Sequence, residues 1–170
     1  MNKTRIISFC GIAIALGVIL SRFLSINTPI VQISFSFVPI IIVAEVLGWK
    51  YSTIVAASID LIGALLFPFG TYFFGFTVSA ALSGFIYGIC LYHKTEWSSK
   101  KLLIMTLIAC LVIDFLVHAV LNTIWLRIMY NKYFDLLLPI RYIKQLLILP
   151  FQVFIAIICD RMIKDKIRLK

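Results

Sequence analysis

The chain has 170 residues, of which 62% are hydrophobic and only 14% are charged, and its formal net charge at pH 7 is +9. Soluble domains carry about 25% charged residues, so this composition excludes an ordinary water-soluble domain. Long apolar runs recur along the whole chain. We therefore predict an all-α integral membrane protein, a compact bundle that forms a single membrane-embedded domain over residues 1–170.

Six apolar segments predict six transmembrane helices. They cover about Thr4–Leu24, Phe37–Leu47, Ser52–Phe67, Phe74–Tyr92, Leu102–Leu126 and Leu136–Ile163. The first segment is not followed by a small-residue cleavage site, so we expect it to be retained rather than removed as a signal peptide. The second is short for a full crossing, and we expect surrounding protein to shield it. Pro150, inside the last segment, predicts a kink there.

The basic residues predict that both termini are cytoplasmic. This orientation leaves only five of the 16 Lys and Arg residues outside: Arg22, Arg127, Lys132, Arg141 and Lys144. The positive-inside rule favours it. The net charge of +9 then mainly reflects the orientation of the helices in the membrane, with the basic tail against anionic lipid headgroups. We do not expect nucleic-acid binding, because the sequence has no soluble basic domain. Cations on the disfavoured outer side indicate attraction of an anion, although snorkelling at helix ends is the alternative interpretation.

Several kinds of chemistry are absent from the sequence. It contains no GxxxxGK[ST], HExxH or GxSxG motif and no acidic DDxxD cluster. We therefore predict that the protein is not an enzyme and needs no cofactor, and that any ATP hydrolysis driving transport belongs to other chains. We interpret the four cysteines as small apolar packing residues, because their spacing does not match that of metal ligands. They are Cys10, Cys90, Cys110 and Cys159.

Two of the predicted helices carry polar residues in register. On the fifth helix these are Asp114, His118, Asn122 and Trp125, which fall within roughly 80° of one another. On the sixth they are Arg141, Gln145 and Gln152, within roughly 40°, flanked by Lys144. Ionisable groups at membrane depth usually face a bundle interior or a watery cavity. We take both stripes as candidate ligand contacts, the alternative being that they satisfy each other between helices.

Small residues are also patterned. Gly11 and Ala15, with Ala13 and Gly17, give small-xxx-small spacing in the first segment, and Ala80, Gly84 and Gly88 repeat it in the fourth. Such faces let helices approach closely, but the pattern alone does not separate packing within the chain from docking onto a partner. Asp60 lies on a small-residue face of the third segment, and we expect it to hydrogen-bond between helices rather than to a ligand.

Four blocks of sequence together resemble the folate-specific substrate-binding components (the FolT family of S components) of energy-coupling-factor (ECF) vitamin transporters. The blocks are LSRFL from Leu20, LLFPFGTYFFGFTVSAALSGFIYG from Leu65, LNTIWL from Leu121 and LLPIRYIKQLLILPFQ from Leu137. With the length and the six predicted spans, the resemblance covers nearly the whole chain.

The resemblance implies a subunit of the bacterial cell membrane that captures folate or reduced folate at its outer face. It would work with a membrane scaffold subunit (EcfT) and two cytoplasmic ATPases, and Gly11, Ala13, Ala15 and Gly17 match the position that docks on the scaffold. Folate has a flat pterin and a glutamate tail with carboxylates. Arg22, Arg141 and Lys144 could neutralise the tail. Asn122, Gln145 and Gln152 could read the pterin edge, with Trp125 stacked on it.

Two alternatives remain open. The same architecture could bind another anionic heterocyclic vitamin, because the outer cations favour an anion without naming it. The chain could also be a membrane assembly subunit without a ligand, although two aligned polar stripes are costly in a scaffold.

Overall fold

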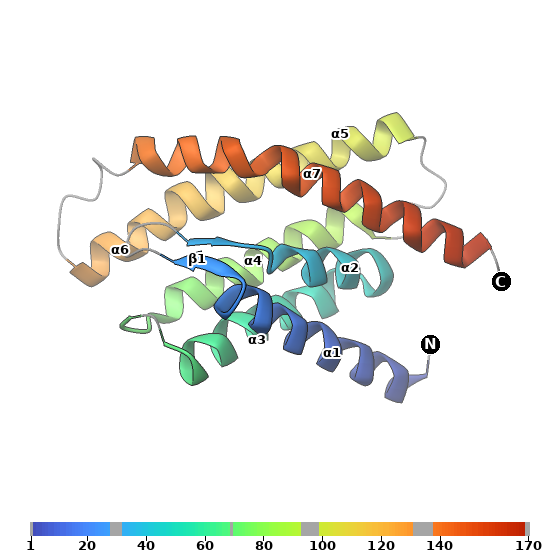
Figure 1. The fold of residues 1–170 in the computed structure, drawn as a ribbon, viewed down its shortest axis with the longest axis horizontal. Coiled ribbons are helices and arrows are strands. Elements are labelled where there is room, and N and C mark those ends of the chain that lie inside the picture. The colour runs from blue at the N-terminus through green and yellow to red at the C-terminus, as the bar shows by residue number, and fades with distance from the viewer. Residues whose placement is uncertain (1, 28–31, 69, 93–98, 131–137, 169–170) are drawn as a thin grey trace.

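The computed structural model describes residues 2–27, 32–68, 70–92, 99–130 and 138–168 (Figure 1). The helices are α1 (Lys3–Arg22), α2 (Phe37–Leu47), α3 (Trp49–Leu66), α4 (Phe74–Leu91), α5 (Ser99–Leu111), the π-helix η1 (Val112–Leu121), α6 (Asn122–Tyr130) and α7 (Leu138–Arg168). Strands β1 (Ser25–Asn27) and β2 (Gln32–Ser34) pair antiparallel between α1 and α2, with Ile26 opposite Ile33.

The all-α prediction is confirmed, and each helical segment begins and ends within a few residues of the predicted one. The short hairpin was not predicted. Among the described residues, four helical stretches are long and apolar enough to cross a membrane, namely Lys3–Arg22, Trp49–Leu66, Phe74–Leu91 and Leu103–Met129. The shorter apolar helices there are Phe37–Leu47 and Gln145–Cys159. The count of six crossings and the cytoplasmic termini stay predictions. Figure 1 shows both chain termini at one end of the bundle, as an even number of crossings requires.

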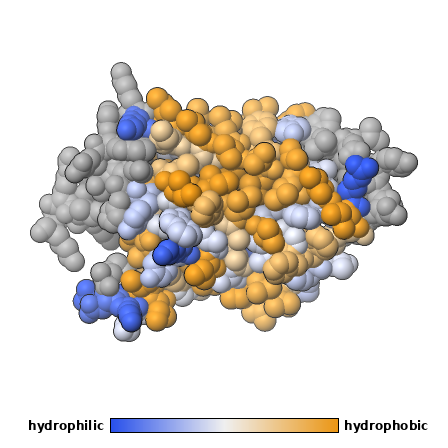
Figure 2. Space-filling view, turned by 180° about the vertical axis from the view of Figure 1, so that it is seen from behind, coloured by the Kyte–Doolittle hydropathy of each residue, from blue (hydrophilic) through white to orange (hydrophobic). Residues whose placement is uncertain are grey.

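Two ends of the bundle are named for what they carry. The hairpin end holds β1, β2 and the close of α6, and the terminal end holds both chain termini (Figure 1). Between them the surface is apolar. Figure 2 shows hydrophobic residues over the middle of one face and most hydrophilic residues towards the two ends. Large apolar side chains such as Ile12, Leu147 and Phe154 are more than half exposed. This distribution suits a bilayer rather than water.

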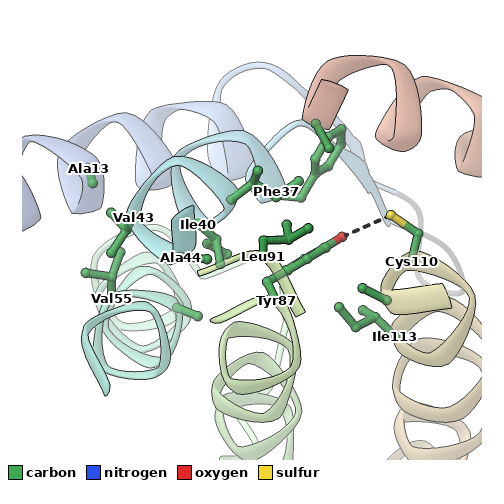
Figure 3. Close-up of a cluster of buried hydrophobic side chains, with 14 of the residues drawn as sticks. Ala13, Phe37, Ile40, Val43, Ala44, Val55, Tyr87, Leu91, Cys110 and Ile113 are labelled. Carbon is green, nitrogen blue, oxygen red and sulfur yellow. Dashed lines mark hydrogen bonds between the residues drawn. The ribbon is translucent and has the colours of Figure 1, made fainter. Parts of the chain in front are cut away.

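Helix α2 lies in the centre of the fold. It packs against α1, α3, α4 and α7, and Ile41, Val43 and Ala44 are fully buried. The expectation that other helices shield this short segment is therefore confirmed. Figure 3 shows Tyr87 of α4 extending past this core to α5, where its hydroxyl lies 3.9 Å from the Cys110 sulfur. The cysteine is thus a buried packing residue, as predicted.

Helices α3 and α4 pack backbone to backbone through small residues. The Ser52 hydroxyl donates to the Gly84 carbonyl at 2.7 Å. A Cβ at Gly84 would meet the Ser52 carbonyl, and one at Gly88 would meet the Trp49 Cα. The small-residue pattern of α4 therefore serves packing within the chain, which decides between the two alternatives that the sequence left open for it.

We expect Gly88→Ala to lower the free energy of unfolding by about 1 kcal/mol, because the added methyl group overpacks the α3–α4 contact. Gly11→Ala is the matched control, since an added Cβ at Gly11 meets nothing within 4 Å and alanine favours a helix. Thermal unfolding of both variants in detergent measures the difference. Equal melting temperatures for the two variants would contradict the proposed role of Gly88.

Candidate functional site

Buried amides of α7 meet an acidic residue of η1 inside the bundle. The Gln152 Nε2 donates to Asp114 Oδ1 at 3.2 Å, and the Gln145 Nε2 donates to the Asp114 carbonyl oxygen at 3.4 Å. Asp114 is fully buried, Gln145 is 2% exposed and Gln152 5% exposed. The two predicted stripes therefore face each other. The Gln152 Oε1 is buried without a hydrogen-bond partner among the described residues.

Asn122 carries the second buried acceptor in this region. Its Nδ2 lies 3.4 Å from His118 Nδ1, one turn earlier on the same face. The Asn122 Oδ1 is buried and has no hydrogen-bond partner in the described part of the chain. Leaving a buried amide oxygen unsatisfied costs about 1–3 kcal/mol. Two such oxygens, one on α6 and one on α7, are therefore candidates for accepting hydrogen bonds from a ligand.

Trp125 links α6 to the start of α4. The indole Nε1 donates to the Ser79 hydroxyl at 3.0 Å, and the indole centroid lies 5.7 Å from that of Phe73. Gly75 makes this approach possible, because a Cβ there would lie 2.6 Å from the indole ring. Trp125 is half-buried, so the indole presents a fixed aromatic surface at the hairpin end.

A second polar cluster joins α1, α3 and α4. Asp60 and Arg22 attract each other electrostatically, and Asp60 Oδ2 accepts a hydrogen bond from the Thr77 hydroxyl at 2.7 Å. The Tyr72 hydroxyl lies 2.8 Å from the Thr77 hydroxyl. Gly63 leaves room for the guanidinium, since a Cβ there would lie 2.6 Å from Arg22 Nε. The expectation that Asp60 bonds between helices is confirmed.

The structure unites the predicted residues in part. Gln145 and Gln152 of α7 bond to Asp114 of η1, and Asn122 of α6 lies beside His118 of η1. Trp125 turns towards α4 and Arg22 towards α3. Arg141 and Lys144 lie in the first turns of α7, and their side chains are outside the described residues. Sequence reasoning missed Thr77 and Ser79. Two hydroxyl residues near the start of an apolar helix were the available signal.

The π-helix η1 carries Asp114 and His118 and continues directly into α6. Such segments are rare and occur frequently at functional sites. In the described part of the chain, no group of three or more His, Cys, Asp or Glu residues could hold a metal ion. The groups at the site are a carboxylate, an imidazole, amides, hydroxyls and aromatic rings, which can bond to and stack on a polar aromatic molecule.

Residues 6–159 match the family model of the ECF transporter, substrate-specific component. The chain belongs to this family. Two curated relatives are named folate transporter FolT. That of Clostridium novyi (strain NT) is 36% identical over 155 residues, covering 91% of this chain and 87% of the relative. That of Leuconostoc mesenteroides subsp. mesenteroides is 32% identical over 160 residues, covering 90% and 83%.

A solved structure described as FolT bound with folic acid superposes with a TM-score of 0.79. It is 34% identical, and the match covers 88% of this chain and 89% of that one. The resemblance inferred from the sequence is thus confirmed. The protein is a multi-pass membrane S component, a class of transporter subunit rather than of enzyme.

The small residues of α1 in this S component divide between two faces. Ala13 and Gly17 are buried, and a Cβ at Gly17 would meet Ile59 of α3. Gly11 and Ala15 are exposed. All four were predicted to dock on a partner. The structure leaves only Gly11 and Ala15 on the outward face, so a docking role for α1 rests on these two.

Proposed function

We propose that this S component binds folate or a reduced folate and that residues 1–170 form one substrate-binding domain. The observation that supports this most strongly is the structural match, over most of both chains, to a FolT bound with folic acid. The two curated relatives carry the same name. With both termini cytoplasmic, the hairpin end faces outward and receives the vitamin.

The described groups at the site suit the parts of folate. Its pterin carries N–H donors, which the buried Asn122 Oδ1 and Gln152 Oε1 could accept. The Trp125 indole offers a face for ring stacking. The carboxylate tail requires cations, and Arg22, Arg141 and Lys144 are the candidates. A different anionic heterocyclic vitamin is the alternative ligand, because stacking and cations alone do not distinguish it.

The proposed test is direct. The purified chain is examined for co-purified folate by mass spectrometry and titrated with folate while its Trp fluorescence is recorded. We expect folate to quench the Trp fluorescence of the wild type. Trp125→Phe should lose most of that quenching, because the other tryptophans, Trp49 and Trp97, lie elsewhere in the chain. A full response in Trp125→Phe would remove this indole from the site.

Delivery to the cytoplasm, in this proposal, requires EcfT and two cytoplasmic ATPases, because the chain contains no nucleotide-binding motif. Gly11 and Ala15 would form the close-packing face of α1 towards the scaffold. We expect Ala15→Trp to abolish co-purification with co-expressed EcfT while folate binding is unchanged. Val78→Trp, a substitution of an exposed residue on α4, is the matched control and should leave the complex intact. Loss of the EcfT complex in both variants, or in neither, would contradict the assignment of the docking face to Gly11 and Ala15.

A further inference from the structure

An apolar groove lies between α5 and α7. Its volume is about 390 Å³, and its walls are formed by Leu107, Leu149, Pro150, Val153, Phe154 and Ile157. Leu107 is 39% exposed and Phe154 63% exposed, so the groove opens on the outer surface of the bundle.

The shape of α7 explains why the groove exists. Figure 1 shows α7 changing direction in its middle and separating from α5 towards the terminal end. Pro150 lies within this helix, and a proline removes a backbone hydrogen bond and bends a helix. The bend leaves a gap whose walls are entirely apolar side chains. In the hydrocarbon region such a gap is filled either by a lipid tail or by another helix, since both are equally apolar.

Charge at one end of the groove decides between these occupants. Arg161 is exposed and lies four residues after Ile157 and seven after Phe154, so it continues the α7 wall of the groove. Arg161 lies towards the terminal end, near the close of α7. An apolar groove that ends at a cation complements a molecule with an apolar tail and an anionic head.

We propose that the α5–α7 groove binds an anionic phospholipid, with one acyl chain against Phe154 and Leu107 and the phosphate at Arg161. With the predicted orientation this lipid belongs to the cytoplasmic leaflet. The existence of this lipid site does not depend on which vitamin is bound.

Native mass spectrometry of the full chain with phosphatidylglycerol or phosphatidylcholine of identical acyl chains tests the proposal. We expect preferential retention of phosphatidylglycerol. Arg161→Gln should reduce that preference about fivefold, whereas Lys50→Gln, which removes an exposed cation at the start of α3, should not. Equal retention of the two lipids by the wild type, or an unchanged preference in Arg161→Gln, would overturn the proposal.

The tail is tested separately from the head. Leu107→Trp fills the groove and should reduce retention of both lipids, whereas Ile54→Trp, at an exposed position of α3 outside the groove, should reduce neither. A photoreactive benzoylphenylalanine in place of Phe154 should form a lipid adduct in native membranes. A protein adduct at that position would assign the groove to a neighbouring subunit and would contradict the lipid assignment.

Discussion

Asn122→Leu should weaken folate binding by about 10- to 100-fold. The substitution keeps the approximate size of the side chain but replaces a buried acceptor with an apolar group. If the pterin donates to Asn122 Oδ1, that donor is then buried without a partner, and the full cost of its desolvation opposes binding. Isothermal titration of the purified variant against the wild type measures the change.

Asn122 also separates a binding role from a structural one. Its Oδ1 makes no hydrogen bond within the described residues, and its Nδ2 makes only the long 3.4 Å contact with His118 Nδ1, so the ligand-free variant should melt close to the wild type. By contrast, Gln152→Leu removes the 3.2 Å bond to Asp114 and should lower the melting temperature as well as the affinity. Unchanged affinity in Asn122→Leu, at whatever stability, would exclude this oxygen from the folate site.

Arg22→Met should weaken folate binding at least tenfold, because removing a partly buried cation from a carboxylate typically costs about 2–5 kcal/mol. Arg22 is half-buried at the end of α1, beside Asp60 and the cleared space at Gly63. Arg127→Met is the matched control, since Arg127 is an exposed cation of α6 and should contribute little. Titration of both variants with folate gives the comparison.

The affinity for pteroate, which lacks the glutamate tail, shows how Arg22 acts. It distinguishes a loss of charge neutralisation at the tail from a general disturbance of α1 in Arg22→Met. A cation that binds only the tail should change the affinity for folate but not that for pteroate. Arg141→Ala and Lys144→Ala can be classified by the same pair of ligands, with Arg141→Ala expected to lose tenfold or more for folate. Equal losses for folate and pteroate in Arg22→Met would show that Arg22 does not act through the tail.

The helices were predictable from the sequence because apolar runs are bounded by clear breaks. Ser36 and Gly48 flank α2, and the glycine has a positive φ of 82°, so even this short helix was predicted with its correct ends. The β1–β2 hairpin was missed because two three-residue strands carry too few residues for an alternating pattern. The π-helix was missed because hydropathy does not encode the change from i→i+4 to i→i+5 bonding.

The candidate site was predictable as a set of residue types but not as a geometry. Placing Asp114, His118, Asn122 and Trp125 on one stripe assumed a regular α-helix throughout. The wider turn of η1 intervenes, and Asp114 bonds to α7 while Trp125 bonds to Ser79 of α4. The two faces of α1 likewise required tertiary structure, because the spacing of Ala13 and Gly17 equals that of Gly11 and Ala15 whereas their neighbours differ.

The most direct test of folate binding is a titration of the purified full-length chain, reconstituted in nanodiscs, with folate and with a second anionic heterocyclic vitamin such as thiamine pyrophosphate. We predict saturable binding of one folate per chain at or below micromolar concentration and no binding of the second compound in the same range. No response to micromolar folate, or equal affinity for both compounds, would contradict the assignment of this S component to folate.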